Sequence, residues 1–397
     1  MKLKSKILSF PSPKPGITAY ENSFYTRPTG LEKMRLRILE TADDIFENPS
    51  CSISTDNGRT WPESLPLMRA QKTPQGILRG FENTAFVDPV NGHLVRIATE
   101  GFFRRDTSDE GYTSYYLKYS LSDDGGRTVS VEDQVIEKGR APEHPFDHIW
   151  IGKNAFMNAA PNAVVRTSRG HLIVPVVNSA LGGDGNLFCP FDHVWLEVFI
   201  LIGRWQSNNR IEWQAGPRIT LSTEQSTRGI FEPTIEQMPD GRLLMVMRAS
   251  NANQPRRPGW KWYSVSSDEG FTWTAPQPWR YTDGTAFYSP SSVSQFLRHS
   301  NGRYYWFGNI CPHNPDGNLP RYPVVAVEVD PASLMLVKES AFVVETRQPN
   351  DPATLQLSNF VVHEDRANGD FILHMSTFFP EADGRYSGSA YSYRLEP

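Results

Sequence analysis

Two residues of opposite charge, Glu232 and Arg248, stand where they could act together on a polar ligand. They lie in residues 229–251, where two apolar segments flank the sequence Pro-Asp-Gly at 239–241. Pro presets φ and Gly accepts a positive φ, so this pattern predicts a β-hairpin. Glu232 lies near the start of its first strand and Arg248 near the end of its second. Antiparallel pairing places both at the end away from the turn, so we expect an active rim there.

The hairpin belongs to a repeat that runs through the whole chain. A Gly-centred turn followed by an apolar strand occurs six times, with successive gaps of 62, 78, 71, 61 and 67 residues, at Gly30, Gly92, Gly170, Gly241, Gly302 and Gly369. No helical periodicity interrupts these segments. The repeat predicts an all-β fold, a six-bladed β-propeller of four-stranded antiparallel sheets, with residues 1–397 as a single domain. Two packed β-sandwiches are the alternative. The first twenty residues or the C-terminal segment are expected to close the last blade.

Composition limits the classes of function. The 397 residues carry a net charge of −4, which indicates neither a nucleic-acid partner nor a membrane surface. Aromatic residues make up 12% of the chain and would suit sugar faces or a β core. Three Cys give no disulfide framework, and no cofactor-binding motif or metal-ligand pattern is evident. No segment reads as a signal peptide or membrane span, so we expect a cytoplasmic protein, or a secreted or periplasmic one whose leader was removed.

A second repeat has the pattern S-x-D-x-G-x-T-W. It occurs at residues 54–61 and 266–273, and at 122–129 with Val in place of Trp. This pattern resembles the Asp-box, or BNR repeat, of the sialidase superfamily. In that family the boxes are structural and lie on the face opposite the active site. The resemblance therefore implies structural roles for Asp56, Asp124 and Asp268.

The resemblance also implies roles for charged residues on the opposite rim. Glu232 resembles the family's Glu that tunes the nucleophile, and Arg248 resembles one Arg of the substrate-binding triad. Arg321, in an Asn-Pro segment that begins at Asn314, resembles a second triad Arg. Arg27, followed by Pro, resembles the first. Two such Arg side chains would form a clamp for a carboxylate or sulfate.

The family's acid/base and nucleophile residues match this sequence less well than the Glu and Arg residues do. The family's acid/base Asp lies in the first long loop, where this chain has Asp43 and Asp44. The family's nucleophile is a Tyr in a Y-S-x-L segment, and Leu357 occupies that place here. Another Tyr, such as Tyr288, could serve instead.

The segment 138–158 adds further candidates that are read from residue type alone. His148 is a possible general acid or base near neutral pH. Trp150 is a possible platform for a sugar face, and Lys153 and Asn154 are possible ligand-binding groups.

Together these residues favour an exo-acting glycoside hydrolase of sialidase type, with a carbohydrate as substrate. It would cleave a terminal, acidic sugar with Glu232 and Asp43 or Asp44 as the catalytic carboxylates. Two alternatives remain. One is a polysaccharide lyase in which His148 or a Tyr removes a proton beside a uronate carboxylate. The other is a propeller that binds carbohydrate without catalysis.

Overall fold

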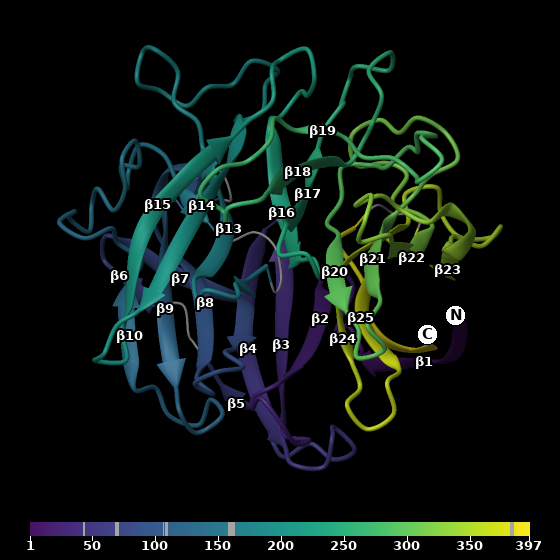
Figure 1. Ribbon diagram of the computed structural model, residues 1–397, viewed down its shortest axis with the longest axis horizontal. Coiled ribbons are helices and arrows are strands. Elements are labelled where there is room, and N and C mark those ends of the chain that lie inside the picture. The colour runs from purple at the N-terminus through teal and green to yellow at the C-terminus, as the bar shows by residue number, and fades with distance from the viewer. Residues whose placement is uncertain (43, 68–70, 106, 108–109, 158–162, 382–384) are drawn as a thin grey trace.

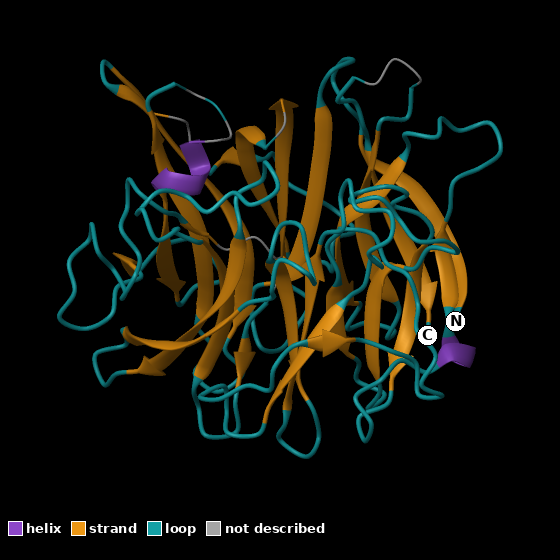
Figure 2. Ribbon diagram, turned by 90° about the horizontal axis from the view of Figure 1, so that it is seen from above, coloured by secondary structure: helices purple, strands orange, loops and turns teal. Residues whose placement is uncertain are grey.

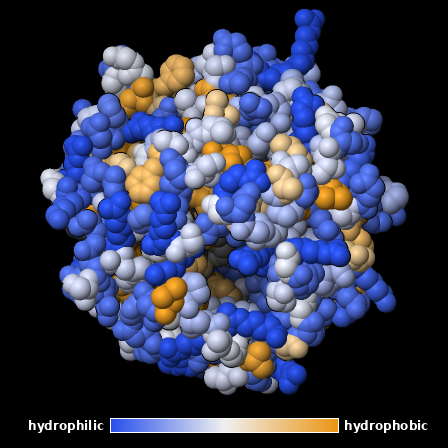
Figure 3. Space-filling view, viewed as in Figure 1, coloured by the Kyte–Doolittle hydropathy of each residue, from blue (hydrophilic) through white to orange (hydrophobic). Residues whose placement is uncertain are grey.

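The fold is a ring of six antiparallel sheets, as the computed structural model shows (Figure 1). The structure describes residues 1–42, 44–67, 71–105, 107, 110–157, 163–381 and 385–397. Seen from the side, the strands run between two faces of the ring (Figure 2). Viewed along the ring axis, the face in view is hollowed near its centre (Figure 3). The predicted six-bladed β-propeller is confirmed.

Blades 1 to 3 follow one another in sequence order. Blade 1 contains β2 (Thr18–Tyr25), β3 (Lys33–Ala42), β4 (Ile45–Ser54) and β5 (Leu65–Pro66). Blade 2 contains β7 (Gly76–Val87), β8 (Leu94–Phe103), β9 (Tyr115–Ser122) and β10 (Val131–Gln134), with β6 (Gln71–Thr73) added beside β7 and α1 (Gly111–Ser114) before β9. Blade 3 contains the short β11 (Phe156–Met157) and β12 (Val165–Arg166), which both pair with β13 (Leu172–Ser179), then β14 (Leu196–Trp205) and β15 (Ile211–Ile219).

Blades 4 to 6 complete the ring. Blade 4 contains β16 (Ile230–Gln237), β17 (Leu243–Ala249), β18 (Trp262–Ser266) and β19 (Gln277–Pro278). Blade 5 contains β20 (Gln295–Arg298), β21 (Tyr304–Asn309), β22 (Val324–Val329) and β23 (Phe342–Glu345), with a 3-10 helix at Lys338–Ser340. Blade 6 contains β24 (Gln356–Glu364), β25 (Phe371–Phe378), β26 (Ala390–Glu396) and β1 (Lys2–Phe10).

Both ends of the chain close the ring. β1 pairs with β26 from Lys2↔Glu396 to Phe10↔Ala390, so the N-terminal strand is the fourth strand of the last blade. This pairing ties the first residues of the chain to the last. Both terminal segments were predicted as candidates for closing the last blade, and both lie in it, as β1 and β26.

Apolar side chains fill most of the spaces between neighbouring blades. Phe146, Phe199 and Trp213 pack between blades 2 and 3, and Trp279 and Trp306 pack between blades 4 and 5. Burial of such aromatic side chains is the main favourable term in folding.

The seam between blades 6 and 1 contains buried polar groups. Ser23 contacts His374 Nε2 at 2.9 Å, and Lys33 Nζ contacts His363 Nε2 at 3.1 Å. Burial lowers the pKa of His374 to about 4 and that of Lys33 to about 8. Hydrogen bonds therefore hold the seam that closes the ring.

The two repeats of the sequence make the turns of one face. All six glycines of the first repeat have a positive φ and connect the first two strands of their blades. The Asp-boxes follow the third strands. Asp56 accepts hydrogen bonds from the backbone N–H of Thr60 at 2.9 Å and from its hydroxyl at 2.6 Å. Those bonds lower the pKa of Asp56 to about 2. The hydrogen bonds of this carboxylate thus lie within its own turn, which agrees with its expected structural role.

Candidate functional site

The end of the ring away from the Gly turns brings charged and polar side chains of four blades together. We call these residues the axial cluster: Tyr20, Glu40, Glu232, Arg248, Lys261, Ser291, Arg321, Gln356 and Asn359. The first strand of each blade starts at this end and the second strand finishes there, because the turn between them lies on the other face. The cluster is assembled by topology rather than by sequence proximity.

Arg248 is the centre of the axial cluster. It is 6% exposed and lies on β17, paired with Phe231 of β16. Its Nη1 lies 2.6 Å from both carboxylate oxygens of Glu232, and its Nε donates to the Ser291 hydroxyl at 2.8 Å. Its Nη2 donates to the amide oxygen of Asn318 at 3.0 Å. The guanidinium also lies over the ring of Phe231, 4.5 Å from its centroid, so its plane is fixed from every side.

A β-bulge aims Glu232 at Arg248. The pairing of β16 with β17 shifts between Phe231 and Thr234, and Glu232 has a φ of 45°. A bulge turns a side chain out of the usual alternation of a strand, and such bulges are common beside active sites. The expected meeting of Glu232 and Arg248 on one rim is therefore what the structure shows, with the bulge as its cause.

Arg321 joins the cluster from the loop between β21 and β22. Its Nε and Nη2 donate to the carbonyl oxygen of Ser291 at 3.1 and 2.9 Å, and its Nη1 donates to Gln356 at 3.0 Å. Ser291 thus bridges the two arginines, through its hydroxyl to Arg248 and its carbonyl to Arg321. The prediction of Arg321 rested on an Asn-Pro segment, and that segment also has a structural role. Its Pro315 carbonyl accepts a hydrogen bond from the side chain of Asn251 at 2.7 Å.

The cluster carries more positive than negative charge. Lys261 is fully buried beside the two arginines and donates to the Ser292 carbonyl. Burial and the charge of Arg248 lower the pKa of Lys261 to about 7, and the same two causes lower the pKa of Arg321 to about 10. Glu232 is the only carboxylate in ion-pair contact with these three cations among the residues that the structure describes. The other N–H groups of the two arginines donate to uncharged oxygens. An incoming anion would therefore reduce the repulsion among the three cations.

Blade 6 repeats the bulge of blade 4 with a different residue. The pairing of β24 with β25 shifts between Ser358 and Val361, and Asn359 has a φ of 52°. Asn359 is therefore the counterpart of Glu232. Leu357 is 1% exposed and packs in the core between blades 5 and 6. Leu357, which the resemblance placed at the nucleophile's position, therefore belongs to the core between blades 5 and 6.

Blade 1 contributes a residue pair that the sequence did not single out. The Tyr20 hydroxyl donates to Glu40 at 2.5 Å, and Glu40 is 2% exposed. Asp44, a predicted catalytic residue, follows in the hairpin turn, and its backbone N–H donates to Glu40 at 3.0 Å. Burial raises the pKa values of Tyr112 and Tyr115, and the negative charge of Asp44 adds to this effect, so Asp44 lies near blade 2. Asp43 lies outside the described residues.

Arg27 does not reach the axial cluster. It lies in the turn between β2 and β3, where it donates to the backbone carbonyl of Asp123 and lies 3.7 Å from Glu32. Asp123 belongs to the Asp-box turn of blade 2, so Arg27 is on the opposite face. Its predicted role in substrate binding is wrong, because the chain reaches the Gly turn directly after β2.

Residues 138–155 form a loop that leads to β11 of blade 3, and the contacts described for this loop do not include the arginines of the axial cluster. His148 is mostly exposed, lies 3.1 Å from Asp147 and belongs to a loop whose Asp147 carbonyl accepts a bond from Arg218 on the outer strand β15. Trp150 stacks on His144 with ring centroids 4.8 Å apart. The positions of these two side chains therefore give no support to the predicted catalytic role of His148 or to the predicted role of Trp150 as a sugar platform.

The remaining predicted residues of the rim do not meet the arginines either. Asn154 is 1% exposed and donates to the carbonyls of His148 and Ser179, which is a structural role. Lys153 is exposed on the same loop. Tyr288 is 38% exposed and pairs through its backbone with Cys311, before β20.

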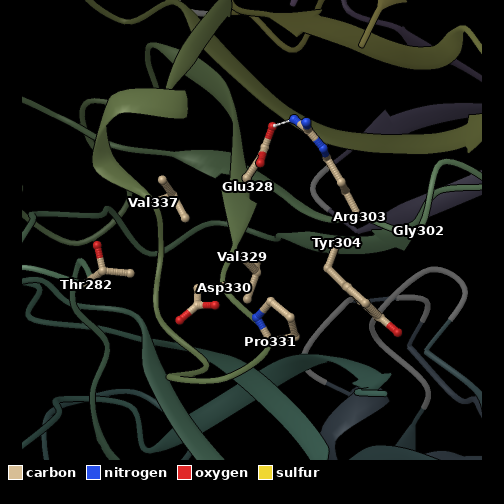
Figure 4. A pocket seen from close by; sticks show the side chains of 9 residues that line it. All are labelled: Thr282, Gly302, Arg303, Tyr304, Glu328, Val329, Asp330, Pro331 and Val337. Atoms are coloured by element: carbon tan, nitrogen blue, oxygen red, sulfur yellow. Dashed lines mark hydrogen bonds and ion pairs between the residues drawn. The ribbon is translucent and has the colours of Figure 1, made fainter. Parts of the chain in front are cut away.

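A cavity at the other face of blade 5 is separate from this site. It is lined by residues of the Gly302 turn and the turn after β22, including Arg303, Glu328 and Asp330 (Figure 4). Arg303 and Glu328 meet at one edge of it and form an ion pair at 2.7 Å. It lies at the opposite end of the strands from Arg248.

Two further features of the described residues bear on function. They hold no group of three or more His, Cys, Asp or Glu placed to bind a metal ion. They also contain no helix that is long and apolar enough to cross a membrane.

The fold and the Asp-boxes together define a six-bladed propeller of the BNR-repeat type. The model of the BNR repeat-like domain family matches residues 50–333, which is more than half of the chain. The chain belongs to this family. The resemblance to the sialidase superfamily that the Asp-boxes indicated is thereby confirmed for family and fold. No curated protein matches the chain significantly in sequence.

Solved structures with the same fold include several sialidases. A protein of unknown function from Dyadobacter fermentans is 13% identical, with a TM-score of 0.64 over 100% of this chain and 99% of that one. The intramolecular trans-sialidase from Ruminococcus gnavus, in complex with oseltamivir carboxylate, is 13% identical, with a TM-score of 0.60 over 92% of both chains. Trypanosoma rangeli sialidase, in complex with the inhibitor DANA, is 14% identical, with a TM-score of 0.59 over 98% of this chain and 55% of that chain. At these identities the likeness concerns the fold.

Proposed function

We propose that this protein is an exo-acting glycoside hydrolase that cleaves a terminal, acidic sugar from a glycan. The observation that supports it most is the charge of the axial cluster. Arg248, Arg321 and Lys261 are buried together with one carboxylate, Glu232. A sugar carboxylate that replaced the amide oxygens of Asn318 and Gln356 would accept hydrogen bonds from both guanidinium groups.

The carboxylates beside this clamp would do the acid/base chemistry. Asp44 lies in the turn above blade 1 and is the group that we assign to protonate the leaving glycosidic oxygen. Glu232 holds Arg248 in place and reduces the repulsion among the three cations. Two of the sialidases that share the fold were solved with ligands, one with the inhibitor DANA and one with oseltamivir carboxylate. These sialidases support the same class of reaction.

The test uses matched pairs of fluorogenic glycosides that differ only in charge, such as a glucuronide and the corresponding glucoside, together with a sialoside. We expect turnover of an acidic substrate and none of its neutral counterpart. Arg321→Met should lower kcat/KM for the acidic substrate by at least about 30-fold, the equivalent of about 2 kcal/mol for a buried charged hydrogen bond. Equal turnover of the neutral partner would refute an anion clamp.

Binding without hydrolysis is the second candidate, and one observation favours it. Asn359 occupies the blade 6 counterpart of Glu232, and a side-chain amide is not a nucleophile. Calorimetric binding of an acidic oligosaccharide that is recovered uncleaved would establish this role. A product with an ultraviolet-absorbing double bond would instead establish a lyase.

A further inference from the structure

Arg228 carries a positive charge that has no carboxylate in ion-pair contact among the described residues. It is half-buried at the entry to β16, four residues before Glu232. Its Nη2 donates to the Tyr112 hydroxyl, and its Nε is buried with no hydrogen-bond partner in the part of the chain that the structure describes. A guanidinium has five N–H donors, so Arg228 keeps donors and an unbalanced charge for an anionic ligand.

Close contact with blade 3 fixes the backbone around Arg228. The Arg228 carbonyl accepts the N–H of Leu196 at 3.1 Å, and the Arg228 N–H donates to the Ser226 hydroxyl at 3.2 Å. Gly229 follows with a φ of 74°, and a Cβ at that position would lie 2.0 Å from the Leu196 carbonyl oxygen. Only glycine fits there, so the Arg228 side chain starts from a defined point beside the first residue of β14.

A buried ring joins Arg228 to the clamp of Arg248 and Arg321. Phe231 is 3% exposed, and the guanidinium carbons of Arg228 and Arg248 lie 5.2 and 4.5 Å from the centroid of its ring. Tyr112 packs against the apolar cluster that contains Phe231, and its own ring centroid lies 5.9 Å from the Arg228 guanidinium carbon. Arg228 is therefore the neighbour of Arg248 on the axial face, held by two aromatic rings.

The contacts of Arg228 lead from the clamp towards blade 2. Arg248 reaches the rest of the clamp through Ser291, whereas Arg228 bonds to Tyr112, which belongs to α1. Asp44, the group that we assign to protonate the leaving oxygen, lies near Tyr112, because its charge acts on that phenol. A glycan held by its terminal carboxylate at the clamp, with its glycosidic bond at Asp44, would extend its leaving sugar on the side of Arg228.

We propose, on the basis of the proposed glycoside hydrolysis, that Arg228 forms a second anion subsite, which binds a carboxylate of the leaving sugar. The substrate class is then a glycan in which a terminal acidic sugar is linked to a second acidic sugar. Arg228 donates to the second carboxylate, and Tyr112 is a positioning residue that orients the guanidinium. Each carboxylate of such a substrate has its own arginine, which offsets the repulsion between the two anions.

The probes are two matched pairs of disaccharides. In each pair the terminal acidic sugar and the linkage are the same, and the leaving sugar is neutral in one member and a uronate in the other. One pair is glucuronyl-glucose with glucuronyl-glucuronate, and the other is sialyl-galactose with sialyl-galacturonate. Product release gives kcat/KM where the disaccharide is cleaved, and calorimetry gives Kd where it is not. We expect the wild type to favour the doubly acidic member by about 10-fold, the effect of one hydrogen bond between charged groups.

Three variants test whether Arg228 causes this preference. Arg228→Met should bring the ratio between the two members to about 1, and Tyr112→Phe should lower it to about 3. Arg218→Met is the matched control. Arg218 also lies over a phenylalanine ring, 5.6 Å from the centroid of Phe199, but it has Glu197 at 3.5 Å and lies on β15. This control should keep the ratio of the wild type. A purely structural role of Arg228 would affect both members alike and leave the ratio unchanged.

The outcomes separate the two proposals. If the wild type cleaves both members of a pair equally well, or if Arg228→Met keeps the preference, the subsite is refuted and the hydrolase stands. If the wild type cleaves neither member but binds the doubly acidic one about 10-fold more tightly, and Arg228→Met abolishes that difference, the subsite stands and hydrolysis is refuted. Failure to bind or cleave any of the four disaccharides refutes both. Should Arg228→Met not fold, the ratios of the wild type and Tyr112→Phe still decide.

Discussion

Replacing Glu232 by Gln tests whether this carboxylate compensates the charge of the buried cations in the axial cluster. Glu232→Gln keeps the size of the side chain and removes its charge. Among the described residues, Arg248, Arg321 and Lys261 then have no carboxylate in ion-pair contact. The side chains of Arg248 and Glu232 are 8% and 16% exposed, and both carboxylate oxygens lie 2.6 Å from Arg248 Nη1. The change therefore acts on a largely buried ion pair.

The expected loss of stability follows from Coulomb's law and from measured ion pairs. With charge centres about 4 Å apart and an effective dielectric constant of about 20, the attraction is about 4 kcal/mol. Removing one partner of a buried pair costs about 3–5 kcal/mol, because the other charge stays buried. We expect Glu232→Gln to lower the free energy of unfolding by about 3 kcal/mol. Part of that loss should return in the double variant with Arg248→Met, which removes the uncompensated charge.

The assay is urea denaturation of the wild type, both single variants and the double variant, followed by tryptophan fluorescence. A coupling free energy of about 2 kcal/mol is expected from the cycle. Additive effects, within about 0.5 kcal/mol, would refute the view that Glu232 compensates the charge of Arg248. The slope against urea should be alike in all four proteins, because a changed slope would report a change in the unfolded or folded state instead.

Two further predictions address the buried lysine and the opposite face. The pKa of Lys261 in the folded protein is about 7, below its ordinary 10.5. Between these values the unfolded chain holds a proton that the folded protein lacks, so this lysine makes stability rise with pH. Lys261→Met should remove that rise, and parallel plots of urea midpoint against pH for both proteins would contradict it. Arg27→Ala should leave kcat/KM unchanged, since Arg27 bonds to the Asp-box turn of blade 2. A fall of more than about 3-fold would place Arg27 in the reaction.

The sequence by itself determined the architecture and one pair of site residues, because their causes are local. The φ of each repeat glycine and the hydrogen bonds of Asp56 to Thr60 act within a few residues, so the turns can be recognised wherever their residues recur. Glu232 and Arg248 belong to one hairpin, and antiparallel pairing fixed which end they share.

Only the tertiary structure decided which other residues join that pair. Tyr20 and Asn359 lie 339 residues apart in the chain, and the closure of the ring brings their side chains into contact. The bulge in β24 selects Asn359 and buries Leu357, since a shift in strand register moves a side chain to the other face. Sequence spacing carries no information about the angle between blades around an axis. Interactions between blades therefore had to be read from the folded ring.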